Sequence, residues 1–174
     1  MYKSRVGGNK TKEYMLFSSM KSRCKKDYVG CSVDSLFEDF QYFAEWCNSQ
    51  IGFKVNSYQM DKDILVAGNK VYSPLNCVFI PKDLNCFNRM NEGTYKQGVS
   101  WHEGTGKFRA RIQLVETQKR VCLGLFETED QAFNVYKAAK EQEARKWYER
   151  LSSGEFLVDP RVTERMKTWT LEQQ

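Results

Sequence analysis

Cationic and amide side chains alternate with apolar ones in one stretch of this sequence. The polar positions are Arg109, Arg111 and Gln113, and the apolar positions between and beside them are Phe108, Ala110, Ile112 and Leu114. A period of two predicts a β-strand with one apolar face and one cationic, polar face. Arginine can contact guanine edges or phosphates, and glutamine can pair with adenine in the major groove. The pattern is compatible with DNA recognition, and equally with an ordinary solvated strand.

The flanking segments predict the elements that would position this strand. GVSWHE (98–103) and RVCLGLF (120–126) have strand character and are separated from it by turn residues. Thr128, followed three residues later by Gln131, predicts a capping box and a helix that runs to about Leu151. One helix can cover only one face of the resulting sheet. By strand parity, the free face should present Ser100, His102, Arg109, Arg111, Gln113, Arg120 and Cys122.

The same β-β-β-α stretch resembles the AP2, or ethylene-response-factor-like, DNA-binding domain. The segments that carry the resemblance are GVSW, GKFRARI, RVCLGLF and TEDQAFNVYKAAK. In that family the sheet enters the major groove. The resemblance therefore implies that double-stranded DNA is contacted by Ser100, His102, Arg109, Arg111, Gln113 and Arg120. Cys122 stands where plant members have a DNA-facing tryptophan, so the target sequence of the plant family cannot be carried over.

A second candidate region is DKDILVAGNKVYSPLNCVFIPKDLN, residues 61–85. It predicts two short apolar strands joined by a turn at Gly68-Asn69, then a proline that opens a polar, helical segment. The charged group at its start, Asp61-Lys62-Asp63, is either an exposed strand end or part of a catalytic site.

Together with MKSRC and FAEW, this region resembles the HNH nuclease modules that are fused to AP2-like units in bacteriophage and mobile-element endonucleases. The resemblance assigns catalysis to Asp61, Lys62, Asp63 and Asn76, and metal binding to Asp61, Asp63 and Asn85. In such a site a divalent ion screens the phosphate and stabilises the leaving oxygen. Oxygen ligands of this kind favour Mg²⁺ or Mn²⁺ over zinc.

Lys62 is the residue that makes hydrolysis uncertain. It stands where active members of that family have histidine, and a lysine with a pKa near ~10.4 cannot accept a proton from water at neutral pH. The only histidine, His102, belongs to the other half of the chain. Three accounts remain open: Asp61 or Asp63 acts as the base, burial depresses the pKa of Lys62, or catalysis is lost and the small fold supports DNA binding.

Helical patterns precede and follow these two regions. Residues 14–26 predict a helix with a cationic C-terminal end. From Val33 to Cys47, apolar residues follow the i, i+3, i+4 rule, which predicts an amphipathic helix with Asp34 as N-cap. Pro160 predicts a further helix start, with Met166 and Trp169 docked behind it. The six cysteines include no C-x-x-C pair, and we expect them to be reduced and mostly buried.

The totals favour a folded protein with an anionic partner. The chain has 174 residues, of which 41% are apolar and 28% charged, and this excludes wholesale disorder. The net charge is +5, and residues 1–26 contain eight Lys or Arg against a single acid, Glu13. No apolar run approaches the ~20 residues that a membrane span needs. We therefore expect no membrane partner and a cytoplasmic location, in a host bacterial cell if the resemblance holds.

These observations predict an α+β protein. Residues 1–92 should contain helices and an HNH-like ββα core, residues 96–152 an AP2-like three-stranded antiparallel sheet packed on one helix, and residues 153–174 a tail. The predicted function is that of a phage DNA-binding protein, with possible Mg²⁺- or Mn²⁺-dependent cleavage of the phosphodiester backbone. One alternative is a DNA-binding protein without catalysis. Another is an accessory protein that binds a host protein through aromatic faces around Phe37, Trp46 and Trp169.

Overall fold

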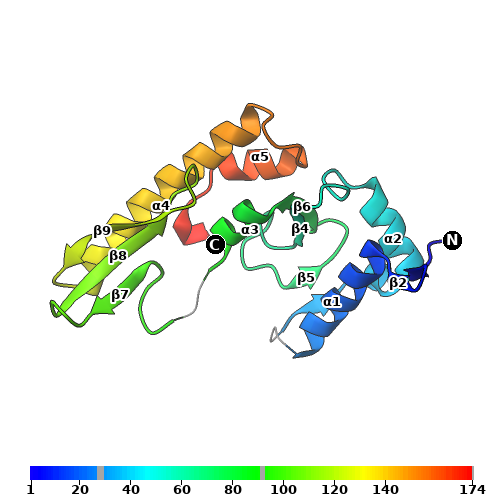
Figure 1. Cartoon of the computed structure of the whole chain (residues 1–174), viewed down its shortest axis with the longest axis horizontal. Coiled ribbons are helices and arrows are strands. Elements are labelled where there is room, and N and C mark those ends of the chain that lie inside the picture. Colours follow the sequence, from blue (N-terminus) through cyan, green and yellow to red (C-terminus); the bar gives the residue numbers. More distant parts are fainter. Residues whose placement is uncertain (27–29, 91–92, 174) are drawn as a thin grey trace. The chain divides into compact units, whose positions relative to one another are not determined.

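The computed structural model shows a mixed α+β chain and is described for residues 1–26, 30–90 and 93–173 (Figure 1). It divides into two compact units. The first consists of Met1–Asn85 with Phe156–Val162, and the second of Cys86–Glu155 with Thr163–Gln174. The division differs from the boundaries expected near 92–96 and 153. The first boundary falls inside helix α3 (Lys82–Asn88), between Asn85 and Cys86. In the C-terminal part of the chain, Phe156–Val162 belongs to the first unit and Thr163–Gln174 to the second.

The first unit begins with a short exposed hairpin and two helices. Strands β1 (Arg5–Val6) and β2 (Asn9–Lys10) pair antiparallel, and α1 (Lys12–Lys26) follows at the position expected from the sequence. The single helix expected from Val33 to Cys47 is wrong. The structure has strand β3 (Ser32–Val33), a 3₁₀ helix η1 (Ser35–Glu38) and α2 (Phe40–Ser49). Asp34 does act as an N-cap, for η1.

The break between η1 and α2 has a local cause. Asp39 adopts an extended backbone, and its side chain accepts a hydrogen bond from the Tyr42 N–H, so it starts a new helix rather than continuing the old one. The break turns Leu36, expected on the inner face, outward, with 49% of its surface exposed. The apolar periodicity therefore predicted a helix correctly only over the residues of α2.

Aromatic rings fill the core of this unit. The Phe37 ring centroid lies 5.0 Å from that of Phe43 and 4.7 Å from that of Trp46, and Trp46 lies 5.9 Å from Phe79. Phe37 is 0% exposed and Trp46 8%. Trp169, in the second unit, is 5% exposed. The aromatic surface proposed for binding a host protein is thus wrong for these three side chains, because each is buried in a core.

The strand order of residues 58–88 differs from the expected hairpin around Gly68-Asn69. Strand β4 (Tyr58–Asp61) pairs antiparallel with β6 (Val78–Pro81), from Tyr58 opposite Pro81 to Asp61 opposite Val78. The short strand between them, β5 (Val71–Tyr72), instead pairs in parallel with β3. A chain turn at Gly68 exists, but residues 62–70 form no strand. The expected helix after the proline is present as α3.

The second unit contains the expected three-stranded sheet and helix. Strands β7 (Val99–His102), β8 (Lys107–Gln113) and β9 (Arg120–Phe126) form an antiparallel sheet in that order. Helix α4 (Glu129–Ser152) packs along it (Figure 1), and the predicted capping box of Thr128 and Gln131 is formed. Helix α5 (Pro160–Lys167) starts at the predicted proline, and η2 (Leu171–Gln173) follows. Met166 and Trp169 are buried, as expected.

All six cysteines are free thiols, but only Cys47 and Cys77 are buried. Cys24 and Cys31 are partly exposed, and Cys86 and Cys122 are exposed, so the expectation of mostly buried cysteines is wrong.

Each helix among the described residues is too short or too polar to cross a membrane.

Candidate functional site

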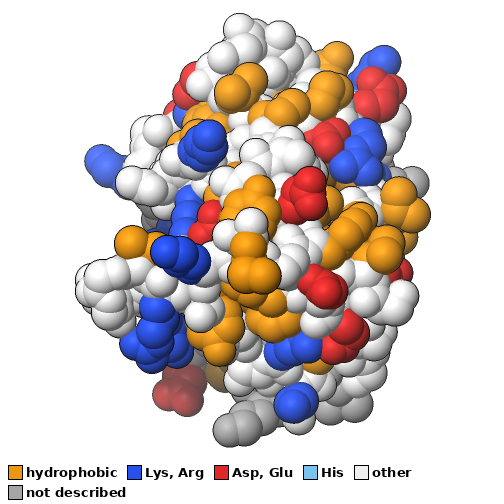
Figure 2. Space-filling view, turned by 90° about the vertical axis from the view of Figure 1, so that its right-hand side faces the viewer, with side chains coloured by type: hydrophobic (Ala, Val, Ile, Leu, Met, Phe, Trp, Pro, Cys, Tyr) orange, Lys and Arg blue, Asp and Glu red, His pale blue; other side chains and the backbone are white. Residues whose placement is uncertain are grey.

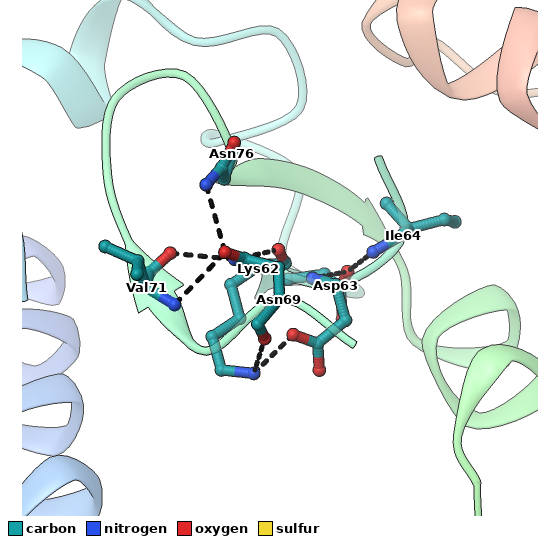
Figure 3. A network of polar contacts seen from close by, with 7 residues as sticks. Lys62, Asp63, Ile64, Asn69, Val71 and Asn76 are labelled. Carbon is teal, nitrogen blue, oxygen red and sulfur yellow. Dashed lines mark hydrogen bonds and ion pairs between the residues drawn. The ribbon is translucent and has the colours of Figure 1, made fainter. Parts of the chain in front are cut away.

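The Asp61 carboxylate is used to shape a turn. Asp61 ends β4 and is 8% exposed, and its Oδ1 accepts the N–H groups of Asp63 at 2.9 Å and Ile64 at 2.6 Å (Figure 3). Burial raises the pKa of Asp61 by more than these N–H donors lower it. A carboxylate held in this way stabilises the loop that leaves β4.

Lys62 is also buried, at 8% exposure, and its ammonium group has partners within the same segment. Its Nζ donates to the Asp63 carboxylate and, at 2.9 Å, to the Asn69 carbonyl, and it lies 5.6 Å from the ring centroid of Tyr72. Burial alone would lower the pKa of Lys62, but the hydrogen bond and charge of Asp63 outweigh it and raise the pKa. The account in which burial depresses the pKa of Lys62 is therefore wrong. In this arrangement Asp63 favours the protonated form of Lys62.

Asn69 is the centre of this network, a role the sequence did not reveal. Its Nδ2 donates to the carbonyls of Lys62 at 2.7 Å and Val71 at 2.8 Å. Its Oδ1 accepts the Val71 N–H at 3.2 Å and the Asn76 Nδ2 at 3.1 Å (Figure 3). A side-chain amide offers two donors and two acceptor sites, and here all four are used. The only sequence signal was the Gly-Asn dipeptide, which predicted a turn but not a side chain with four hydrogen bonds.

The proposed metal ligands are engaged with other protein groups. Asp61 and Asp63 accept the hydrogen bonds described above, and the Asn85 amide, on α3, donates to Gln59 Oε1 at 2.9 Å. Within the described parts of the chain, no group of three His, Cys, Asp or Glu side chains is placed to hold a metal ion. Asp61, Asp63 and Asn85 each have a protein partner, and we assign no step to a metal.

The sheet of the second unit brings the predicted DNA-contacting residues together. Residues directly opposite in an antiparallel pair lie on the same face. The pairs on this face are Ser100 with Arg109, His102 with Lys107, Arg111 with Cys122, Gln113 with Arg120 and Arg109 with Leu125. Ala110 and Ile112, 0% and 4% exposed, lie on the opposite face, which α4 covers. We call the first set the free face.

Two members of the free face were missed by sequence reasoning. Lys107 and Leu125 have the required pairing, and Lys107 forms an ion pair with Glu127 at 2.6 Å. The signal for Lys107 was available, because it alternates with Arg109 in the strand. Leu125 could not be placed by parity, because Ala110 pairs with Gly124 and Arg111 with Cys122, which leaves Leu123 as an extra residue in a β-bulge.

The arginines of the free face carry charge that no neighbouring carboxylate offsets. Among the described residues, Arg109, Arg111 and Arg120 form no ion pair, and the face contains no acidic strand residue. The Arg109 Nε and Ser100 Oγ atoms are buried without a hydrogen-bond partner among these residues. His102 and Gln113 have local partners, the Thr105 hydroxyl at 2.9 Å and Gln118 Oε1 at 2.7 Å. The arginines thus remain available to an anionic ligand.

A different surface of the molecule shows the contrast. The view in Figure 2 mixes Lys and Arg with Asp and Glu, and apolar side chains lie between them. Exposed apolar residues, of which Met15 and Tyr42 are examples in this chain, are common on ordinary protein surfaces. The free face, by contrast, contains no acidic strand residue.

Comparison with models of protein families, with curated proteins and with solved structures yields no match to this chain. Functional inference therefore depends on the residues and their arrangement.

Proposed function

We propose that this chain binds double-stranded DNA through the free face of the β7–β8–β9 sheet. The observation that carries the proposal is that three arginines on adjacent strands, Arg109, Arg111 and Arg120, share one face without a carboxylate partner among the described residues. Strands spaced ~4.8 Å apart make a three-stranded sheet about 10 Å across. That width is comparable to the ~12 Å of the major groove. The resemblance of residues 96–152 to the AP2 family supports the same assignment.

The composition of the free face favours a duplex over a single strand. Proteins that bind single strands use aromatic rings on which bases stack. The aromatic residues of this sheet, Trp101, Phe108 and Phe126, pair with one another in the register of the opposite face. The free face offers Arg111 for guanine or phosphate, and Gln113 for an adenine edge.

We further propose that residues 58–88, whose β4–β6–α3 order is like that of an HNH module, serve as a scaffold and not as a hydrolytic centre. Asp61 caps the turn that follows β4, and Lys62 is a protonated cation held by Asp63. The charge of Asp63 favours the protonated form of Lys62, and Asp61 Oδ1 is occupied by two N–H donors. The function supported best is thus DNA binding without an assigned cleavage step, the first of the two alternatives that the sequence left open.

A salt titration tests the binding proposal. The apparent affinity for a fluorescent duplex would be measured from low to high salt for the wild type and for a triple variant, Arg109→Ala with Arg111→Ala and Arg120→Ala. Each lost phosphate contact should reduce the slope of log K against log salt by ~0.9. The matched control removes three exposed charges from other surfaces, Lys3→Ala with Lys54→Ala and Arg145→Ala. Equal losses in the two triple variants would contradict a role for the free face.

A plasmid assay tests the scaffold proposal separately. Supercoiled plasmid would be incubated with Mg²⁺ or Mn²⁺ and with the wild type, Asp61→Ala, Asp63→Ala or Lys62→Ala. We expect the plasmid to stay intact with every protein. Metal-dependent nicking by the wild type that Asp61→Ala abolishes would show that this segment is a nuclease, and it would leave the binding proposal intact.

A further inference from the structure

Two cysteines of the first unit are brought together by its fold. Cys24 lies in the last turn of α1, and Cys31 directly precedes β3. Both side chains pack against the edge of the same aromatic core, and Cys31 is close enough to Cys24 to raise its pKa. Both are partly exposed, so a small reagent can reach the pair.

The surroundings of Cys24 provide access. It lines a hollow of about 190 Å³ together with Lys21, Lys25, Val33 and Glu38. Burial, and then the neighbouring Cys31, raise the pKa of Cys24, so that this side chain carries its proton at neutral pH. Lys21 and Lys25 favour the approach of an anionic reagent, although Lys21 is paired with Glu38 at 2.6 Å.

The other four cysteines lack this combination. Cys47 and Cys77 are buried, and burial raises the pKa of Cys77 to about 12, so both are shielded from a reagent in water. Cys86 and Cys122 are exposed. Among the described cysteines, Cys24 and Cys31 are the two that are partly exposed and pack against the same core.

We propose that Cys24 and Cys31 form a redox site, which a low-molecular-weight disulfide converts reversibly into an intramolecular disulfide. One cysteine loses its proton and attacks the external disulfide, whose S–S bond breaks and releases one thiolate. The second cysteine loses its proton and attacks the protein sulfur of the mixed disulfide, which releases the other thiolate. Two protons and two electrons thus pass from the protein to the reagent. The new bond requires the sulfurs to approach to ~2.05 Å.

The disulfide would tie the end of α1 to β3. Because β3 pairs with β5, opposite Val71 and Tyr72, the bond would also brace the loop that Asn69 and Lys62 organise. Oxidation is therefore expected to raise the unfolding temperature of the first unit, and reduction with dithiothreitol should reverse the change.

The test uses the full chain with Cys86→Ser and Cys122→Ser, which removes the two exposed thiols. The folded protein would be treated with oxidised glutathione and followed by intact mass and peptide mapping. We expect the loss of two hydrogens, with Cys24 and Cys31 in one cross-linked peptide. Adding Cys24→Ser or Cys31→Ser should instead leave one glutathione on the remaining cysteine, which shows that this residue is reached.

Two results would overturn the proposal. One is a stable glutathione adduct on Cys24 or Cys31 when both cysteines are present, because the second thiol then fails to resolve it. The other is full retention of both thiols under conditions that modify Cys86 and Cys122 in the wild type. Circular dichroism of each variant verifies that the fold is kept.

Discussion

Two regions of this molecule contain similar polar residues, but those residues have different partners. In residues 61–76, the side chains of Asp61, Lys62 and Asn69 bond to the nearby backbone, and Lys62 also pairs with the Asp63 carboxylate. On the free face of the sheet, Arg111 and Arg120 form no ion pair among the described residues. Charged residues that satisfy one another stabilise a loop, whereas charges without a local partner remain available to a ligand. The partner of each side chain, and not its type, separates the two regions.

The largest effect is expected from replacing Gly98, which directly precedes β7 and lies against the Tyr136 ring of α4. Gly98 has φ +77°, and a Cβ there would overlap the buried ring of Tyr136. Gly98→Ala should lower the free energy of unfolding by about 3 kcal/mol or more, from the steric clash and the backbone strain together. DNA binding should then fail although every arginine is kept.

Gly106→Ala is the matched control, because Gly106 has φ +63° and open space around its Cβ position. It should cost only the strain, about 1–2 kcal/mol. Guanidinium unfolding of both variants measures the difference. Equal losses would show that the contact with Tyr136 is unimportant.

Two buried lysines, one in each unit, should respond to pH in opposite directions. Lys140 is 7% exposed, and its Nζ donates to the Phe87 carbonyl at 2.6 Å and lies 3.6 Å from the centroid of the Phe87 ring. Burial lowers the pKa of Lys140 to about 8. Between pH 8 and 10.5 the unfolded chain binds a proton that the folded chain has lost. The free energy of unfolding, relative to Lys140→Met, should therefore rise with pH across this window, on the order of 3 kcal/mol.

For Lys62 the sign reverses, because its folded-state pKa is raised above 10.5 by Asp63 against the effect of burial. Its stabilisation is complete below the pKa of the unfolded chain and is lost as pH rises through the folded-state pKa. The difference between the wild type and Lys62→Met should thus fall above pH 10.5. Urea unfolding at a series of pH values checks both. If the stability differences for Lys140→Met and Lys62→Met changed with pH in the same direction, the partners assigned to these two lysines would be wrong.

A single arginine should separate binding from stability. Arg111→Ala is expected to weaken duplex binding by ~1–3 kcal/mol if Arg111 reads a base edge. The midpoint of thermal unfolding should barely change, because Arg111 has no ion pair among the described residues. The control is Arg145→Ala, an exposed charge on α4 of the same unit. Unchanged affinity across a salt series would remove Arg111 from the interface.

The smallest effect is expected in the loop network, and it should affect stability alone. Asn69→Ala removes four hydrogen bonds and should lower the free energy of unfolding by ~1–2 kcal/mol, since the partly buried Lys62 carbonyl and Asn76 amide lose their partner. Asn85→Ala removes one exposed bond to Gln59 and should cost under ~0.5 kcal/mol. Chemical unfolding and duplex binding would be measured on both. A loss of binding without a loss of stability in Asn69→Ala would place this loop in the interface.

Local signals predicted much of the second unit. The alternation from Phe108 to Gln113 gave the correct strand, and Thr128 with Gln131 gave the correct helix start. In the first unit the same methods failed at Asp39, which divides a continuous apolar pattern into two helices. They also failed at the pairing of β4 with β6 and of β3 with β5, because pairing between distant segments leaves no periodic signal in either one.

By itself, the sequence determined which side chains share a face of β8 and where α4 is capped. These features follow from the period of two and from hydrogen bonds within a few residues. Only the tertiary structure decided that Asp61 and Lys62 are engaged and that Arg111 is not. Solvation and partner choice depend on what lies nearby in space. Asn69 shows this most clearly, because a residue predicted only to make a turn holds the whole loop together.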